Sequence, residues 1–139
     1  MTHADLARPS EDFPAGGLAI VVGASGGIGR ALLDRLSDKA RFRMALGLSR
    51  RSDPPLELAD EQSIVRAARH VQALGHELRL VIDATGFLHG DGLAPEKSWR
   101  DLDAAHLARA FAVNAIGPAL LMKHFLPLLP RQGKSVFAT

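Results

Sequence analysis

The sequence predicts an α/β fold built on a parallel sheet, and two observations lead to this prediction. Short apolar runs without polar alternation recur along the chain, which is typical of strands that are buried on both faces. Between these runs lie segments whose apolar residues recur at spacings of three and four, as on one face of a helix. Strands that alternate with helices form parallel sheets with helices on their faces.

The first predicted strand covers residues 18–22, an uninterrupted apolar and mostly β-branched run. A glycine-rich turn follows at 23–29. The helix after it is predicted from apolar residues at helical spacing, namely Ile28, Ala31, Leu32 and Leu36. Strand, turn and helix together open a βαβ unit.

Further strands are predicted at 44–48 and, after Pro54 and Pro55, as a short third strand at 56–58. Asp60 is a plausible N-cap of the next helix, and Gly75 is expected to end it. The apolar face of this helix is predicted to hold Ile64, Ala67, Ala68 and Val71.

A fourth buried strand is predicted at 78–84, and a loop rich in Gly, Asp and Pro runs from Phe87 to about Lys97. A long helix then starts after Asp101 or Asp103 and extends toward Pro127. Residues 134–139 are predicted to form a fifth strand. We therefore expect a tail at 1–17 and one domain at 18–139, with about five strands.

Composition excludes several classes of protein. The chain has 139 residues, enough for one domain, with 47% hydrophobic and 23% charged residues. A net charge of +2 without a run of basic residues makes nucleic acid an unexpected partner. We expect no membrane partner, because no segment offers roughly 18 consecutive apolar residues. No cysteine is present, which fits a reducing, cytoplasmic location. No histidine spacing suggests a metal site, and His3, His70, His76, His89 and His106 are expected at the surface or in loops. Trp99 is expected to pack near the start of the long helix.

The glycine-rich turn predicts a site for a diphosphate, because the free amides at a helix N-terminus favour anions. Gly23 allows the tight turn out of the strand, Gly27 leaves room for phosphate, and Gly29 lets the helix pack closely on the sheet. Ser25 can donate its hydroxyl in the same loop. A mononucleotide P-loop would need Gly-Lys-Ser/Thr where this chain has Ile28-Gly29-Arg30.

The end of the second strand predicts a preference for NADP(H). An acidic residue about 20 residues past the glycines would bind the ribose 2′-hydroxyl of NAD. This chain has Ser49, Arg50 and Arg51 there, and arginine binds phosphate in a bidentate manner. The alternative is a solvated pair of surface arginines.

The motif Gly23-x-x-x-Gly27-Ile28-Gly29 resembles the cofactor-binding signature of the short-chain dehydrogenase/reductase family, with Val22 in place of the usual threonine. This resemblance implies a Rossmann-type, doubly wound parallel sheet that is incomplete on its C-terminal side. The stretch Gly86-Phe87-Leu88-His89-Gly90, followed by Pro95-Glu96-Lys97, is similar to the C-factor-like branch of the family.

The resemblance also implies further site residues. Glu57 and Leu58 stand where the family contacts the adenine, with Glu57 in place of the usual Asp. Asp83-Ala84-Thr85-Gly86 corresponds to the family's Asn-Asn-Ala-Gly, so Ala84, Thr85 and Gly86 are expected to line the cofactor. The polar role of the asparagines would fall to Asp83 and Thr85, although Asp83 can equally be an ordinary carboxylate at a strand end.

Asn114 corresponds by resemblance to the family's active-site asparagine, whose carbonyl holds a water in a proton relay. The residues support an unusual backbone here, because Pro118 cannot donate to the carbonyl four residues before it, which is that of Asn114. A packing kink with an incidental asparagine is the alternative. The apolar helix around Asn114 is expected to be buried on more than one side, by a partner subunit in a homodimer or by later parts of the chain.

The chain holds no tyrosine, whereas the resemblance implies catalysis by a serine and a Tyr-x-x-x-Lys motif located beyond Thr139. Two interpretations follow. The chain is the front part of an NADP(H)-dependent oxidoreductase acting on a small carbonyl or alcohol substrate, or it is a natural non-catalytic NADP-binding or signalling module. The unpaired edge expected at the fifth strand favours the first interpretation, and in either case this chain alone is expected to be inactive.

Overall fold

A computed structural model describes residues 12–38, 41–90 and 92–139 of the chain. Most of the expected N-terminal tail, residues 1–11, lies outside the described residues. The rest of it is packed: the ring of Phe13 lies 5.3 Å from that of Phe42, and the first strand begins at Gly17.

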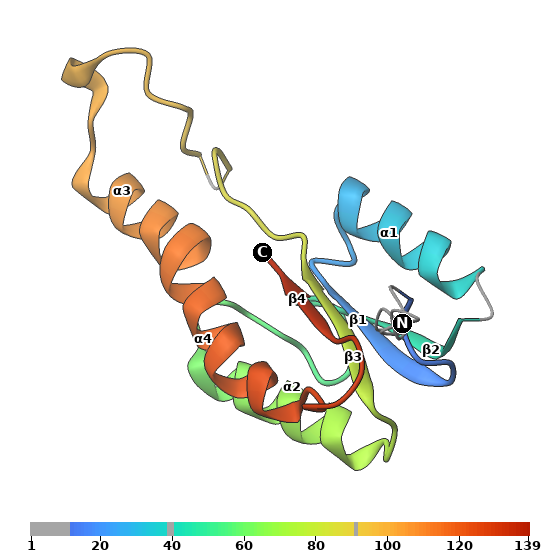
Figure 1. The fold of residues 1–139 in the computed structure, drawn as a ribbon. Helices are drawn as coiled ribbons and strands as arrows, with labels where there is room; N and C mark the ends of the chain where they lie inside the picture. Colours follow the sequence, from blue (N-terminus) through green and yellow to red (C-terminus); the bar gives the residue numbers. More distant parts are fainter. Residues whose placement is uncertain (1–11, 39–40, 91) are drawn as a thin grey trace, which may run out of the picture.

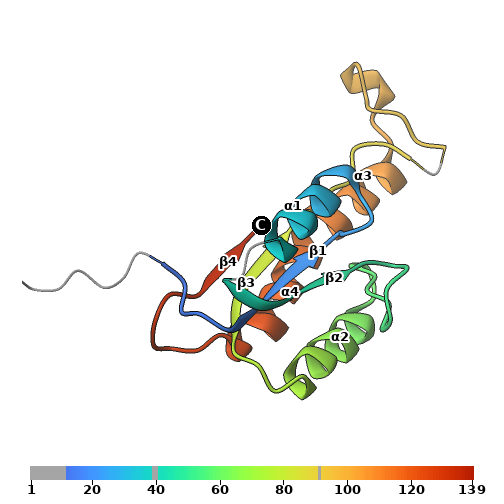
Figure 2. The same ribbon diagram turned by 90° about the vertical axis from the view of Figure 1, so that its right-hand side faces the viewer.

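Four parallel strands form one sheet in the order β2-β1-β3-β4. Their bounds are β1 Gly17–Val22, β2 Phe42–Leu48, β3 Leu78–Asp83 and β4 Val136–Ala138. The helices include α1 Gly27–Ser37, α2 Glu61–Ala73, α3 Ala104–Phe111 and α4 Gly117–Phe125. Helix α1 covers one face of the sheet, and α2 with α4 covers the other (Figures 1 and 2). The predicted α/β fold with a parallel sheet is therefore confirmed.

Strand β1 lies at the centre of the sheet and is buried along its whole length. Leu18, Ile20 and Val22 belong to the larger core on the side of α2 and α4. Ala19 belongs to a smaller core on the α1 side. This two-sided burial explains why the run is apolar without alternation.

The expected third strand at 56–58 is not formed, so the sheet has four strands rather than five within the described residues. The backbone amides there have other partners: Leu56 N donates to Ser49 O at 2.8 Å, and Glu57 N donates to the Ser63 hydroxyl at 2.8 Å. The side chains of Leu56 and Leu58 are buried in the larger core. This segment is thus held by its side chains and by local bonds instead of by a ladder to β2.

Helix α2 follows the sequence prediction. The Asp60 carboxylate accepts from Gln62 N at 3.0 Å and caps the helix. Gly75 follows the last turn with φ +70°, a conformation that favours glycine. The four predicted apolar residues are buried, namely Ile64, Ala67, Ala68 and Val71.

Helix α1 differs from its predicted apolar face. Ile28 is 75% exposed, and Ala31 is also exposed. The helix packs on the sheet through Gly29 and the half-buried Leu32, Leu33 and Leu36 instead. Because the contact at its first turn is made by glycine backbone, the axis lies too close to the sheet for Ile28 to turn inward.

The predicted long helix begins after Asp103, whose carboxylate accepts from His106 N at 2.8 Å. It continues as α3, a π-helical turn at Ala112–Ile116, α4 and a final 3-10 turn at Leu126–Leu128. One stripe faces the core with a residue every fourth position, formed by Val113, Gly117, Leu121 and Phe125. Short strand β4 then adds to β3.

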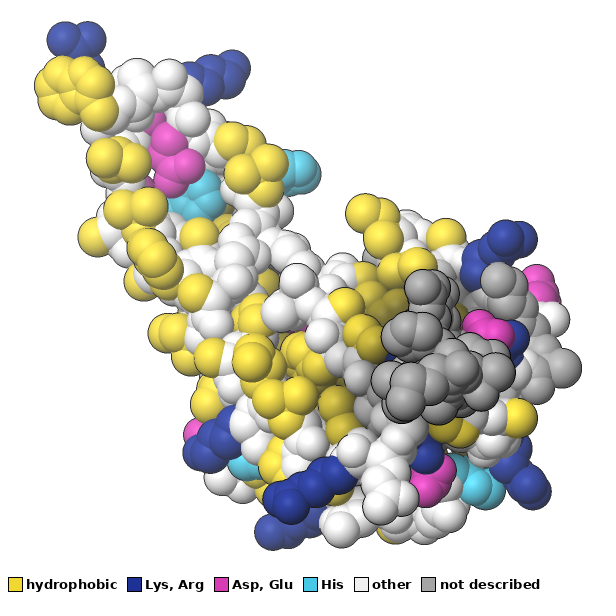
Figure 3. Space-filling model, in the orientation of Figure 1, with side chains coloured by type: hydrophobic (Ala, Val, Ile, Leu, Met, Phe, Trp, Pro, Cys, Tyr) yellow, Lys and Arg dark blue, Asp and Glu magenta, His cyan; other side chains and the backbone are white. Residues whose placement is uncertain are grey.

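Within the described residues one side of this helix packs on the core, and burial of its other side stays a prediction. Large apolar side chains are exposed along it, and Figure 3 shows hydrophobic side chains gathered along α3. We call this set the apolar strip: Leu107, Phe111, Ile116, Met122 and Leu126, which are 37–63% exposed. Both expected covers, a partner subunit and later parts of the chain, would lie on this strip.

The helical run Ala104–Leu128 is 25 residues long, and its most apolar 18-residue window has a mean hydropathy of 1.3. By length and composition alone it could cross a membrane, contrary to the expectation that no segment could. The reason is that the window carries few charges, although polar residues interrupt it. Core helices of soluble proteins pass the same test, and α4 packs against a sheet through Leu121 and Phe125.

Candidate functional site

A cavity of about 320 Å³ opens at the carboxyl ends of the strands. Val22, Leu48 and Asp83 are aligned in the register at these ends, so the loops after β1, β2 and β3 leave from the same edge. The chain winds from β1 outward to β2 and then crosses back to β3 on the other side of β1. Ligands of open α/β sheets bind at such a switch point.

The glycine-rich turn forms one wall of this cavity. Gly23 has φ +82°, in the left-handed region that favours glycine. Its amide and that of Ala24 both donate to Leu48 O, at 2.8 and 3.2 Å. Gly26 is the N-cap of α1 and offers no side chain to the helix amides. The first amides of α1 are therefore not capped by a side chain, and an uncapped helix N-terminus favours anions.

Gly27 and Gly29 have opposite surroundings. A Cβ on Gly27 would meet nothing within 4 Å, so open space lies in front of it. A Cβ on Gly29 would overlap the carbonyl of Gly23. These surroundings match the roles expected from the sequence, room for phosphate at Gly27 and close packing at Gly29.

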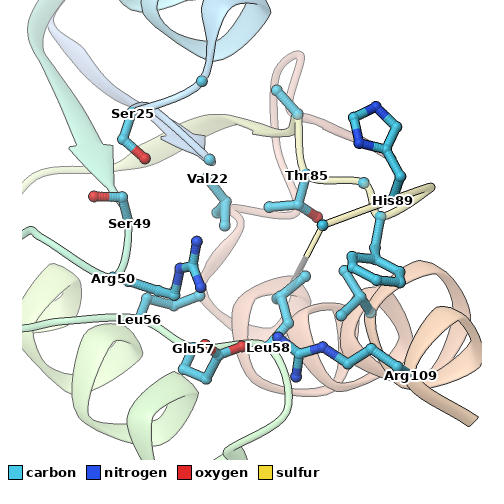
Figure 4. Close-up of a pocket in the computed structure, with 17 residues that line it drawn as sticks. Val22, Ser25, Ser49, Arg50, Leu56, Glu57, Leu58, Thr85, His89 and Arg109 are labelled. Atoms are coloured by element: carbon cyan, nitrogen blue, oxygen red, sulfur yellow. The ribbon is translucent and has the colours of Figure 1, made fainter. Parts of the chain in front are cut away.

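Of the residues after β2, Ser49 and Arg50 line the cavity and Arg51 does not. The Arg51 amide donates to the Ser49 hydroxyl oxygen at 3.1 Å, which turns the chain and leaves the Arg51 side chain exposed. Figure 4 shows the Ser25 and Ser49 hydroxyls near each other, with Arg50 beside them. The predicted arginine pair is thus one guanidinium at the cavity and one at the surface.

Glu57 and Leu58 also line the cavity. The Ser63 hydroxyl fixes the Glu57 backbone at both ends, since it accepts from Glu57 N and donates to Glu57 O at 2.9 Å. Leu58 is buried against α4, where a Cβ on Gly117 would come within 2.7 Å of the Leu58 Cβ. The predicted adenine-contacting segment is therefore held by α2 on one side and α4 on the other.

Ala84, Thr85 and Gly86 line the cavity beyond β3. Asp83 Oδ1 accepts from both the amide and the hydroxyl of Thr85, at 3.0 and 2.6 Å. Its other oxygen accepts from the Thr139 hydroxyl at 3.0 Å. Asp83 therefore ties the end of β3 to the loop and to the residue after β4.

Asn114 lies in the π-helical turn and binds the chain just beyond Gly86. Its Oδ1 accepts from Phe87 N at 2.7 Å, and its Nδ2 donates to Phe87 O at 2.6 Å. In the π turn Gly117 N donates to Ala112 O, five residues before it. Pro118 has no N–H, so it cannot donate the usual helical hydrogen bond to the carbonyl of Asn114. The backbone is unusual where the sequence predicted it, while the side chain fixes the cavity wall.

The structure brings together nine of the predicted site residues at the cavity, which are Gly23, Ser25, Ser49, Arg50, Glu57, Leu58, Ala84, Thr85 and Gly86. Gly27, Ile28, Gly29, Arg51 and Asn114 do not line it. Gly27 and Gly29 nevertheless shape the adjoining turn, and Asn114 acts through Phe87. Ile28 points to the surface of the described chain.

Sequence reasoning missed several residues of the opposite wall. Phe87, His89 and Arg109 line the cavity there, and Figure 4 shows Arg50 and Arg109 approaching it from opposite sides. The Arg109 guanidinium lies 5.8 Å from the Phe87 ring centre. Arg109 stands four residues before Val113, one helical turn away on the same face, and this spacing was the available signal.

Two aromatic residues near this wall also differ from expectation. His106 was grouped with surface histidines but is 4% exposed. Trp99 was expected to pack near the start of the long helix, but it is 74% exposed there, with the Arg100 guanidinium 4.8 Å from its ring. His3 lies outside the described residues.

Comparison with known proteins places the chain beside dehydrogenases and reductases. It is 32% identical over 136 residues to polyprenol dehydrogenase of Mus musculus, which covers 85% of this chain and 38% of that protein. A short-chain type dehydrogenase/reductase from Mycobacterium ulcerans matches 91% of this chain and 51% of its own, with a TM-score of 0.74 at 19% identity. The NADPH-bound carbonyl reductase from chicken fatty liver matches 83% and 49%, with a TM-score of 0.68 at 22% identity.

No family model matches the sequence. The chain spans well under two thirds of each of these proteins, about half of each solved structure and less of the mouse protein.

Proposed function

We infer that this chain binds NADP(H) as the cofactor-binding part of an oxidoreductase of the short-chain dehydrogenase/reductase type. It resembles the N-terminal portion of such proteins in fold and motif. The observation that carries this proposal is the cavity at the switch point of the sheet, where an uncapped helix N-terminus and Arg50 meet. The substrate of the whole protein would be a small carbonyl compound or alcohol. The relatives are named as dehydrogenases and reductases, which supports this class.

The residues fit a dinucleotide on chemical grounds. In the turn that holds Gly23, Ser25, Gly27, Ile28 and Gly29, open space lies in front of Gly27, so a diphosphate can approach the backbone there without meeting a Cβ. At one end of the cavity Arg50 and Ser49 offer donors for a further phosphate.

Elsewhere in the cavity, Glu57 and Leu58 would contact the adenine. Ala84, Thr85 and Gly86 would line the middle of the cofactor. NADP(H) would supply the hydride. The chain's own contribution is to bind and orient the cofactor, and Asn114 would hold the wall beside it through Phe87.

The preference for NADP(H) over NAD(H) rests on charge. The 2′-phosphate adds negative charge next to Arg50, and no carboxylate lies within ion-pair distance of Arg50 among the described residues. Arg51 was expected to share this role, but it does not line the cavity, which makes it the lesser contributor. The NADPH-bound reductase with the same fold is consistent with this preference.

Fluorescence titration of the chain with NADPH and NADH tests the proposal. We expect NADPH to bind at least about tenfold more tightly, since one charge-assisted bond to phosphate contributes about 1.5–3 kcal/mol. Arg50→Asp should remove most of this difference, while the matched variant Arg51→Asp should retain it. Equal affinities for the two nucleotides, or equal effects of both variants, would contradict the NADP(H) assignment.

A further inference from the structure

His106 is a buried histidine of α3 whose two ring nitrogens both face oxygen atoms. Nδ1 lies 2.9 Å from the Glu96 carboxylate, and Nε2 lies 3.3 Å from the Leu88 carbonyl. The side chain is 4–5% exposed, and Glu96 is itself mostly buried. A buried polar ring with both nitrogens engaged resists displacement, because leaving either contact would strand a polar group away from water.

These contacts join two ends of one connection. Leu88 lies near the start of the segment between β3 and α3, and Glu96 lies near its end. Between them, the described residues pair locally, with reciprocal hydrogen bonds between Gly90 and Leu93 at 3.0 and 2.8 Å. His106 therefore fastens the segment to α3 at both ends, and we call His106 with Glu96 the histidine clamp.

Phe87 is the cavity residue that the histidine clamp controls. Its ring lies edge-on to His106, with centroids 5.6 Å apart at 89°. Asn114 binds its amide and its carbonyl, which fixes the backbone at one point. The ring direction is set by the contact with His106 and by Arg109 on its face.

The position of Phe87 matters to a particular part of the cavity. Ser49 and Arg50 mark one end, after β2, whereas Phe87 and His89 mark the other, after β3. Figure 4 shows His89 across the cavity from Ser49. A dinucleotide whose adenosine phosphate lies at Arg50 would extend toward Phe87 with its remaining portion.

We propose that the histidine clamp is a positioning device: His106, held by Glu96, places Phe87 so that the cavity accepts the portion of NADPH beyond the adenosine phosphates. This inference rests on the proposed function and extends it to residues that do not touch the cofactor. When the cavity wall is already ordered, binding does not include the free-energy cost of ordering it, and the affinity for the ligand is higher.

The test compares two probes, NADPH and 2′,5′-ADP, which carries only the adenosine end. We expect His106→Ala and Glu96→Ala to weaken NADPH binding about tenfold, because binding would then have to order the Phe87 wall, and to leave 2′,5′-ADP within about twofold. Glu96→Gln should restore most of the NADPH affinity, because its amide oxygen still accepts from Nδ1. His124→Ala is the matched control, since His124 also pairs with a glutamate, at 2.9 Å, but lies away from the cavity.

Amide exchange of Phe87, followed by NMR without any nucleotide, gives a second readout. Exchange should accelerate in His106→Ala and Glu96→Ala but not in His124→Ala. The reason is that the hydrogen bond from the Phe87 amide to Asn114 should open more often once the Phe87 ring is no longer held by His106. Unchanged exchange in the folded variants, or equal losses for NADPH and 2′,5′-ADP, would overturn the inference. If the unaltered chain binds neither nucleotide, the proposed function fails, whereas the exchange result still decides whether the clamp holds Phe87.

Discussion

Two glycines at the start of α1 occupy neighbouring positions in the same motif, yet the structure gives them different physical constraints. Gly29 is constrained by the fold, since any Cβ there would overlap the Gly23 carbonyl. Gly27 faces open space and is constrained only if a ligand fills that space. The motif alone suggests both roles, and substitution can separate them.

We expect Gly29→Ala to destabilise the chain by about 2 kcal/mol, as overpacking against a rigid backbone does. Gly27→Ala should leave stability within about 0.5 kcal/mol, because a helical alanine there meets no atom, and yet weaken NADPH binding at least about tenfold. Urea unfolding and NADPH titration measure the two effects. A Gly27→Ala chain of normal affinity would mean that the diphosphate does not lie in front of this turn.

The arginines after β2 show a limit of reasoning from sequence at this scale. Arg50 and Arg51 are adjacent and chemically identical, so the sequence assigned them the same task. The bond from Arg51 N to the Ser49 hydroxyl turns the chain so that only Arg50 reaches the cavity. Which of two neighbours faces a ligand depends on a turn geometry that composition does not reveal.

Among the elements, α2 and α4 are joined at their exposed ends by Glu61. Its Oε1 accepts from Lys123 Nζ at 2.7 Å and lies 2.9 Å from His124 Nε2. The hydrogen bond from Lys123, followed by that from His124, lowers the pKa of the Glu61 carboxyl below its ordinary value of 4.5. A depressed folded-state pKa contributes stability that is present above the unfolded value and is lost as the pH falls through the folded one.

We therefore expect Glu61→Gln to lower the melting temperature near pH 7 and to matter progressively less below pH 4.5. The effect should be small, because the group is exposed and its ion pairs are screened. Thermal melts of both chains across this range measure it. Asp34→Asn, which breaks an exposed pair within α1, serves as a control. A melting difference that stays constant down to pH 3 would mean that the Glu61 charge is not its cause.

The long helix shows how far an element can be predicted. Its start at Asp103 and its unusual backbone near Asn114 follow from side-chain chemistry that the sequence displays, a capping carboxylate and a proline without an N–H. The short strand expected at 56–58 failed because its two apolar residues, Leu56 and Leu58, can be buried by side-chain packing without joining a ladder. Short apolar runs carry no information about where their backbone bonds go.

At the scale of the whole molecule, the sheet has a cavity at the carboxyl ends of its strands, while the chain contains no tyrosine of the kind that short-chain dehydrogenases/reductases use as acid or base. We expect this chain by itself to bind NADPH and to show no measurable reduction of ketones or aldehydes. NADPH consumption with a panel of small carbonyl compounds measures this. Turnover that scales with the concentration of the chain would contradict the expectation and assign chemistry to residues present here.

The apolar strip belongs to this scale as well, because it concerns what covers the molecule. Exposed apolar patches of this kind are usual at interfaces, and a second copy of the chain would be one cover for it. Sedimentation of the chain over a range of concentrations distinguishes a discrete dimer from the open-ended association that an uncovered strand edge invites.

The sequence by itself determined the alternation of strands and helices and the place of the glycine-rich turn, because these depend on local periodicity and on residue types that tolerate few substitutes. Tertiary structure alone decided which arginine faces the cavity, that His106 is buried on Glu96 and Phe87, and that the sheet has four strands. These features arise where segments distant in the chain meet. The free energy of such contacts depends on the packed neighbour, which no local pattern specifies.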